Sequence, residues 1–284
     1  MSLPLNKACD LGDFADPELA ALIREVLPHD AARFGPSFPR GREYRKHWEI
    51  AMAVRSMRAA GKLHPGAEVL GVGAGNEPTI FYLTTQVRRV FATDLYLAPG
   101  WEESASAQMM TDPGRYWPGV WEPRRLVVQH MNALELQHPD DSFDAVFSSS
   151  SLEHFGDLEA VRRSLSEMRR VLKPGGLLSI STEYRVGGPG PGMPGVLMFD
   201  AEELAGLIAA GGWEPLDGLD LSVGPATLRA PLRFNDALAD LARHTKAHGG
   251  DILFHKLDWS RYPHILLEHE GRTWTSVHLA LLKP

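Results

Sequence analysis

The sequence predicts an α/β domain in which a mostly parallel sheet is covered by helices on both faces. From residue 68 onwards, short apolar stretches alternate with stretches rich in helix-forming residues, a pattern typical of parallel sheets flanked by helices. A glycine-rich turn follows the first apolar stretch. The chain has 284 residues, which is enough for one large domain with a sizeable core.

Seven strands are expected, at residues 68–72, 89–93, 126–129, 143–148, 177–182, 213–221 and 275–282. The helical pattern over residues 158–172 stops at a Lys-Pro-Gly-Gly sequence, at 173–176. Asp200 is a good N-cap for a further helix, which Gly211 and Gly212 would end.

Three segments do not follow this alternation. Residues 1–62 are expected to form an N-terminal helical cap, with a helix over 45–63, on a domain of residues 63–284. Residues 223–273 form an insertion before the last strand, with a helix near 234–248, and are expected to serve in substrate binding or in oligomerisation, for example as a homodimer. Residues 187–195 form a Gly/Pro-rich loop. The loop and the insertion are both expected to lie outside the sheet.

Composition restricts the partners and the compartment. The formal net charge is −7, from 29 basic and 36 acidic residues. The basic residues are scattered, which argues against nucleic acid as a partner. Cys9 is the one cysteine, so an internal disulfide and a cysteine-rich metal site are excluded. No apolar run of signal-peptide or membrane-span length is present. We therefore expect a cytoplasmic protein with a small-molecule substrate and no membrane partner.

The glycine-rich turn is the first sign of a ligand site. Gly71, Gly73 and Gly75 lie at the carboxyl end of the first expected strand, where glycine allows a sharp turn and a close approach to a ligand. Asp94 ends the next strand, about 20 residues further on, which is the spacing of a ribose-binding acid. The alternatives are an ordinary turn and a solvent-facing Asp. These features alone do not separate a dinucleotide from S-adenosylmethionine, although Pro78 stands where the dinucleotide fingerprint requires glycine.

Five motifs in order resemble the class I S-adenosylmethionine-dependent methyltransferases, with a methyltransferase type 11-like domain. They are V-L-G-V-G-A-G, A-T-D-L-Y, H-M-N-A-L-E-L, P-D-D-S-F-D-A-V-F-S-S-S-S-L-E-H-F and V-L-K-P-G-G-L-L-S-I-S. The resemblance covers about residues 68–221 and 275–282. It implies a Rossmann-like fold, S-adenosylmethionine as the cofactor, and transfer of its methyl group to a small acceptor, for example a hydroxyl of a sugar or of a natural-product intermediate.

The resemblance also implies cofactor-binding roles along the carboxyl edge of the sheet. The glycine turn would hold the methionine end, Asp94 the ribose, and Asn132 the adenine amino group. The complete set is Gly71, Gly73, Ala74, Gly75, Asp94, Leu95, Met131, Asn132, Ala133, Ser148 and Ser149. Two positions depart from the family pattern: Gly71 replaces an acid that normally helps to hold the amino group of the cofactor, and Glu77 replaces a glycine. Glu77 could partly supply the missing charge.

Candidate catalytic residues follow the fourth and fifth strands. His154 is the first candidate for a general base, since imidazole titrates near neutral pH; packing beside the cofactor is its structural alternative. Glu183 is the second candidate, and a surface cluster is its alternative. His47, Trp48 and Glu49 could cover the cofactor from the N-terminal helix. No metal site is expected, because the helical pair His244 and His248 lacks the H-E-x-x-H pattern.

Two competing functions remain open from the sequence. One is an NAD(P)-dependent oxidoreductase, against which Pro78 and the motifs after Asp94 argue. The other is a catalytically degenerate methyltransferase fold that serves as a binding or regulatory protein, an idea motivated by Gly71.

Overall fold

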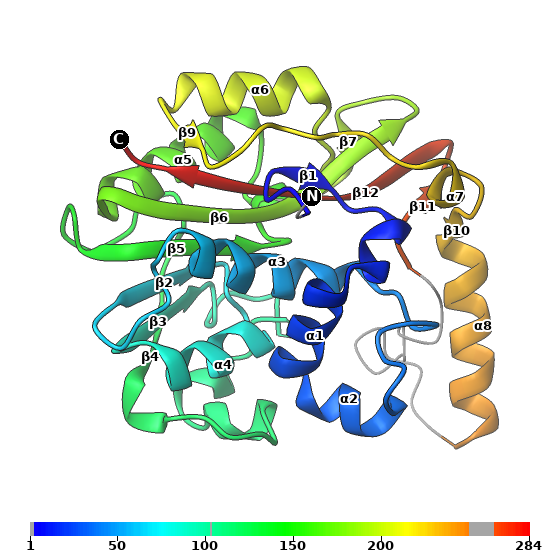
Figure 1. Ribbon diagram of the computed structural model, residues 1–284, viewed down its shortest axis with the longest axis horizontal. Coiled ribbons are helices and arrows are strands. Elements are labelled where there is room, and N and C mark those ends of the chain that lie inside the picture. Colours follow the sequence, from blue (N-terminus) through cyan, green and yellow to red (C-terminus); the bar gives the residue numbers. More distant parts are fainter. Residues whose placement is uncertain (1–2, 103, 250–263) are drawn as a thin grey trace.

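The computed structural model describes residues 3–102, 104–249 and 264–284. Its main feature is a twisted sheet of ten strands (Figure 1), rather than the seven expected. In spatial order the strands are β10 (Leu232–Arg233), β11 (Leu267–His269), β12 (Arg272–Leu282), β6 (Leu172–Gly187), β5 (Phe143–Ser149), β2 (Glu68–Val72), β3 (Arg89–Asp94) and β4 (Leu126–His130). β1 (Lys7–Ala8) and β9 (Glu214–Pro215) both pair with β12.

The parallel part of the sheet confirms the expected fold class. β4, β3, β2, β5 and β6 are parallel to their neighbours, and β12 is antiparallel to β6. The differences lie at the edge beyond β6. Of the expected strand 213–221, Glu214 and Pro215 form the short strand β9, and Asp220 forms an isolated bridge with Lys7. The insertion is not wholly outside the sheet, because β10 and β11 extend the sheet beyond β12.

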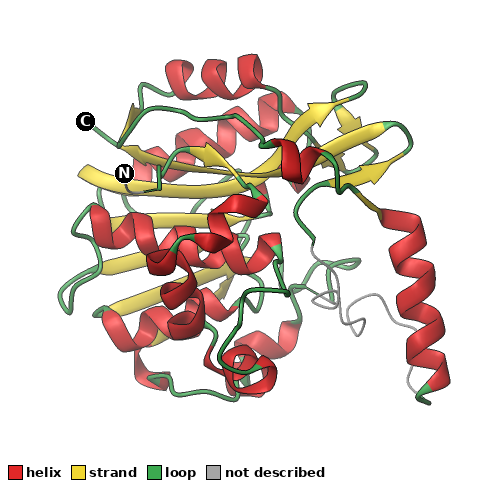
Figure 2. Cartoon of the chain, turned by 45° about the vertical axis from the view of Figure 1, so that its right-hand side comes forward, coloured by secondary structure: helices red, strands yellow, loops and turns green. Residues whose placement is uncertain are grey.

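Helices cover both faces of the sheet (Figures 1 and 2). The α-helices are α1 (Pro17–Val26), α2 (Pro28–Phe34), α3 (Arg45–Ala59), α4 (Pro78–Gln86), α5 (Leu158–Val171), α6 (Ala201–Ala210), α7 (Pro225–Leu228) and α8 (Phe234–Ala247). The 3₁₀ helices are η1 (Leu11–Ala15), η2 (Ala107–Met110), η3 (Pro113–Tyr116), η4 (Pro123–Arg125) and η5 (Leu152–His154).

Two hydrophobic cores lie on opposite sides of the sheet. Successive strand residues point to opposite faces, so Val69 packs in the core with α1, α3 and α4, whereas Leu70 packs in the core with α5 and α6. Leu177 and Leu178 alternate in the same way on β6. The N-terminal helices α1 and α3 therefore share one core with the sheet.

Local signals in the sequence explain where the helices begin. The Asp157 side chain accepts a hydrogen bond from the Ala160 N–H at the start of α5. Asp200 and Glu203 form a capping box at the start of α6. Both arrangements satisfy N–H groups that a helix leaves unpaired.

The Gly/Pro-rich loop and the insertion have structure of their own. The loop forms a small antiparallel pair, β7 (Gly192–Met193) and β8 (Val196–Leu197), separate from the main sheet. α8 projects from one end of the molecule in both views (Figures 1 and 2). Residues 250–263 of the insertion lie outside the described residues. Within the described ranges, no helix combines the length and apolar character needed to cross a membrane.

Candidate active site

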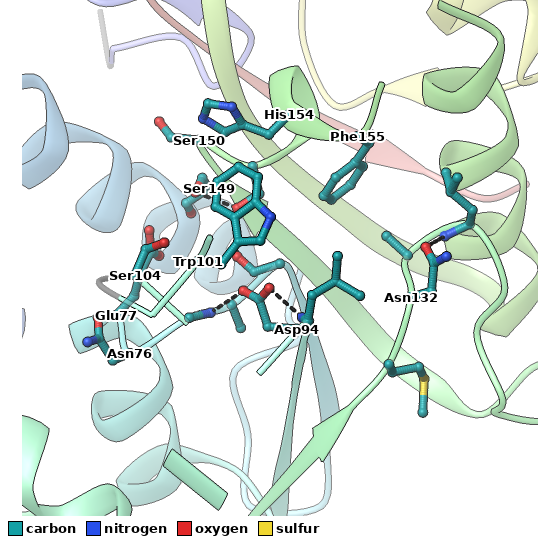
Figure 3. A pocket seen from close by; sticks show the side chains of 18 of the residues that line it. Asn76, Glu77, Asp94, Trp101, Ser104, Asn132, Ser149, Ser150, His154 and Phe155 are labelled. Atoms are coloured by element: carbon teal, nitrogen blue, oxygen red, sulfur yellow. Dashed lines mark hydrogen bonds between the residues drawn. The ribbon is translucent and has the colours of Figure 1, made fainter. Parts of the chain in front are cut away.

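A cavity of about 480 Å³ opens at the carboxyl ends of β2, β3, β4 and β5 (Figure 3). This volume is within the usual range of small-molecule sites, and the carboxyl edge is where parallel α/β sheets bind ligands. Its lining residues are Lys46, Gly73, Ala74, Gly75, Asn76, Glu77, Asp94, Leu95, Trp101, Ser104, Met131, Asn132, Ala133, Leu134, Ser149, Ser150, Ser151, His154 and Phe155.

The glycine turn forms one wall of the cavity. Gly73 and Gly75 have φ angles of +63° and +50°, which glycine adopts without strain. A Cβ atom on Gly75 would lie 2.5 Å from the backbone oxygen of Ser104. Gly71 lies behind the turn and outside the lining, where a Cβ atom would be 2.7 Å from the ring of Phe147. The Phe147 ring thus leaves no room for the acid that the family usually has at this position.

Asp94 is held rigidly at the end of β3. Its Oδ2 accepts the Gly75 N–H at 2.8 Å and its Oδ1 accepts the Leu95 N–H at 2.6 Å. Burial raises the pKa of the Asp94 carboxyl, and the two N–H groups partly oppose this. A carboxylate has about four acceptor sites. One site on each oxygen therefore remains for a ligand diol.

The segment after β4 forms the next part of the wall. The Met131 N–H donates to the carbonyl oxygen of Asp94 at 2.9 Å, which ties this segment to β3. The Oδ1 atom of the exposed Asn132 accepts the Leu134 N–H at 2.9 Å. That oxygen keeps a second lone pair, so Asn132 can still accept a hydrogen bond from a ligand amino group.

The two serines expected at the end of β5 differ in position. Ser149 lines the cavity. Ser148 is fully buried and is not part of the lining, because adjacent strand residues point to opposite faces.

α3 reaches the cavity with a residue that the sequence analysis did not select. Trp48 is buried and donates its indole N–H to Asp13 at 2.9 Å, and Glu49 is buried too. The residue of this helix that lines the cavity is Lys46, whose Nζ lies 3.1 Å from Glu49 Oε2. Near it, Glu77 lines the cavity directly after the glycine turn.

His154 lies where it was expected, in η5 on the cavity wall. Its Nδ1 is 2.8 Å from the carbonyl oxygen of Gly195 in the Gly/Pro-rich loop. Its ring packs edge-on against Trp101, with centroids 5.3 Å apart. Figure 3 shows Trp101, His154 and Phe155 together at one side of the cavity.

Glu183 is not part of the cavity lining. It is buried on β6 and paired with Arg45, whose Nη1 lies 2.5 Å from Glu183 Oε2. The expected strand ended near this residue, but β6 continues to Gly187 and pairs Glu183 with Ser276 of β12. Glu183 therefore lies within the sheet.

Comparison with known proteins identifies the family. Residues 70–180 match a family model described as a methyltransferase domain. A probable S-adenosylmethionine-dependent methyltransferase of Mycolicibacterium smegmatis is 27% identical over 243 residues, which cover 84% of this chain and 79% of the relative. The chain belongs to the class I S-adenosylmethionine-dependent methyltransferases. It is thus an enzyme of this class, and the oxidoreductase and the degenerate binding protein are not supported.

A second curated relative of this methyltransferase carries a more specific name. The 27-O-demethylrifamycin SV methyltransferase of Amycolatopsis mediterranei is 29% identical over 201 residues, which cover 65% of this chain and 68% of that protein.

Solved structures share the fold at low sequence identity. A putative sarcosine dimethylglycine methyltransferase from Galdieria sulphuraria has a TM-score of 0.56 and 17% identity, with 82% of this chain and 84% of that chain covered. The [4+2]-cyclase SpnF has a TM-score of 0.54 and 21% identity, with 86% and 85% covered. Since a cyclase shares the fold, the fold alone does not define the reaction.

The cavity of the methyltransferase fits its cofactor, S-adenosylmethionine. Asp94 presents free acceptor sites for a diol, and Glu77 presents a buried carboxyl oxygen, Oε2, that has no hydrogen-bond partner among the described residues. A buried polar atom without a partner is costly and is expected where a ligand supplies the partner.

Several lining residues were missed by the sequence analysis. Phe155 is the last residue of the fourth of the five motifs, so a motif did indicate it. Trp101 and Ser104 belong to an irregular loop without a sequence signal. Lys46 precedes the His-Trp-Glu sequence of α3, and only the way that helix packs on the sheet shows which of its residues faces the cavity.

Proposed function

We propose that this methyltransferase methylates a hydroxyl group of a small, largely apolar natural-product intermediate, with His154 as the general base. Support for an apolar acceptor comes from Trp101, Phe155 and Leu134, which line the cavity together with His154. The similarity to a rifamycin O-methyltransferase supports transfer to oxygen.

The hydrogen bond between His154 and Gly195 carries the proposal. A carbonyl oxygen can only accept, so Nδ1 of His154 donates its proton in this contact. The neutral ring then keeps a lone pair on Nε2. This is the tautomer that a general base requires, and the contact also fixes the ring, as the partner of a catalytic imidazole commonly does.

The chemistry of methyl transfer determines what the cofactor supplies and what the residues of the chain must do. When bound, S-adenosylmethionine supplies a methyl group that is already activated by its sulfonium. The residues of the chain align the acceptor, exclude water and remove the hydroxyl proton. Glu183 has no part in this proposal, because it is buried against Arg45 and is absent from the cavity wall.

A panel of acceptors tests the proposal, with the methylated atom identified by mass spectrometry and NMR. Phenols and polyketide alcohols should be methylated on oxygen, and matched amines and carboxylates should not. His154→Ala and His154→Gln should lower kcat by about 10²- to 10⁴-fold and leave the affinity for S-adenosylhomocysteine within about twofold. His64→Gln, exposed before β2 and outside the cavity lining, is the control and should not change kcat.

Two results would overturn the assignment of His154. One is a variant with normal turnover on a hydroxyl acceptor. The other is a variant that loses cofactor affinity but keeps full turnover at saturation, which would make His154 a binding residue. Methylation of an amine or of a carbon atom would refute the acceptor class.

We also propose a cytoplasmic location and a homodimer. Cys9 is buried as a free thiol, a state that a reducing compartment preserves. Residues 223–273, from which α8 projects, are our candidate for substrate binding or for the dimer contact. Light scattering on the purified chain tests the dimer, and a monomer at micromolar concentration would refute it.

A further inference from the structure

We propose that Glu77 and Lys46 bind the amino-acid end of the cofactor, with the carboxylate of Glu77 receiving the α-ammonium group and Lys46 receiving the α-carboxylate. The proposal concerns the cofactor and does not depend on the acceptor proposed above. These two charged residues would replace the acid that is usual for the family, since Gly71 stands at its position and the Phe147 ring fills its space.

The position of Glu77 supports its part. It precedes the first residue of α4, with an extended backbone and no capping hydrogen bond from its side chain. The side chain faces the cavity instead, where it has a hydrogen bond with the Ser149 side chain. Its Oε2 atom is buried without a hydrogen-bond partner among the described residues. An ammonium group in the cavity would supply that partner.

Lys46 supports the other half of the pair. Of the described residues that line the cavity, Lys46 alone carries a permanent positive charge. Its side chain is 31% exposed, and Nζ has one anionic contact, at 3.1 Å to Glu49 Oε2. An ammonium group has three donors, so Lys46 can hold Glu49 and a ligand carboxylate at the same time. A zwitterionic ligand end would thus meet one charge of each sign.

The charged groups around α3 determine which side chain is protonated in the free enzyme and can release a proton when the ligand binds. Arg45 is paired with Glu183, and Lys46 with Glu49, so both cations already have an anion. Burial raises the pKa of Glu77 to about 8, with Glu49 and Asp94 adding to the shift and Lys46 opposing it. The free enzyme therefore holds a proton on Glu77 at neutral pH.

Ligand binding reverses this state. A cation beside a carboxyl group favours its ionised form, so the α-ammonium group displaces the proton from Glu77. The charged and titratable groups that face Glu77 are Lys46 and Glu49 on α3, Asp94 at the end of β3 and Tyr96 in the loop that follows. Below about pH 8, the affinity for the ligand should rise by up to about tenfold for each pH unit. Above that pH the α-amino group of the ligand itself loses its proton.

Calorimetric titration of the full chain tests the proposal. S-adenosylhomocysteine is titrated at pH 7 in two buffers of different ionisation enthalpy, which gives the number of protons released. The wild type should release nearly one proton, and Glu77→Gln almost none. At pH 8, Glu77→Gln should bind about tenfold more weakly than the wild type, and this difference should shrink as the pH falls towards 6. Glu135→Gln, exposed and outside the cavity, is the matched control and should behave as the wild type.

A second ligand separates this site from the ribose site. 5′-Methylthioadenosine keeps the adenine and the ribose but lacks the amino-acid end, so the wild type should bind it without releasing a proton. Neither Glu77→Gln nor Lys46→Met should change its affinity by more than about twofold, whereas Lys46→Met should weaken S-adenosylhomocysteine by about tenfold.

Two results would overturn the proposal, and both come from the wild type, so they do not depend on a variant that folds. One is binding of S-adenosylhomocysteine without proton release. The other is equal proton release with both ligands, which would place the titrating group beside the ribose, at Asp94.

Discussion

Asp94 allows the cofactor site to be tested with a quantitative expectation. Its carboxylate gives one acceptor site on each oxygen to the N–H groups of Gly75 and Leu95 and leaves one site on each for a ribose hydroxyl. Asp94→Ala removes the acceptor from both hydroxyls. Loss of a hydrogen bond to a charged group costs about 1.5–3 kcal/mol, so the Kd for S-adenosylhomocysteine should rise roughly 10- to 150-fold.

The assay must separate the ribose contact from an effect on the turn, because the same carboxylate holds Gly75. We would titrate S-adenosylhomocysteine and its 2′-deoxy analogue into both the wild type and Asp94→Ala by calorimetry. If Asp94 binds the diol, the wild type should discriminate between the ligands and the variant should not, so the two losses are not additive. An equal loss of affinity for both ligands in the variant would refute the diol contact and show that Asp94 acts through the turn.

Two further predictions concern the backbone and the pH dependence of stability. Gly75→Ala should abolish cofactor binding, because its Cβ atom would lie 2.5 Å from the backbone oxygen of Ser104, at a φ of +50°. The control is Gly61→Ala, at a φ of +67° with nothing within 4 Å of the added Cβ atom, which should cost about 1 kcal/mol of stability and leave cofactor binding unchanged. Normal cofactor binding by Gly75→Ala would contradict the close approach. Burial lowers the pKa of His278 to about 4, so the unfolded chain takes up a proton that the folded chain does not, and as the pH falls from about 6.5 to 4 the unfolding free energy should drop by about 3 kcal/mol. Urea unfolding at several pH values measures this drop in unfolding free energy, which should be smaller in His278→Gln than in the wild type by about the same amount. Identical pH profiles of stability for the two proteins would refute the assignment to His278.

The sequence was informative where a local pattern determines the structure. The five parallel strands and the starts of α5 and α6 follow from apolar runs and from Asp caps, which act within a few residues. The glycine turn, Asp94 and His154 were also found, because each lies at the end of a strand or just after it.

The remaining features depend on contacts between distant segments. β10 and β11 are too short to show a pattern. They form because β12 offers a pairing edge to β11, and β11 in turn offers one to β10. Glu183 was wrongly expected at the end of a strand, because nothing in the sequence of β6 shows that its pairing with β12 continues beyond this residue. The proximity of Lys46 to Glu77 joins residues that are 31 positions apart and arises only when α3 packs on the sheet.

The pairing of β12 with β1 has a consequence for how the protein folds during its synthesis on the ribosome. Lys7 pairs with His278, and Ala8 with Val277, so β1 is bound by a strand that is made much later. The parallel strands β2 to β6 can associate while synthesis continues, since domains fold as their segments emerge. Lys7 and Ala8 can pair with β12 only after residues 277 and 278 have been made, although the same segment also bonds to Asp217 and Asp220. The pairing of β1 with β12 is therefore a late step, in which two segments far apart in the sequence come together.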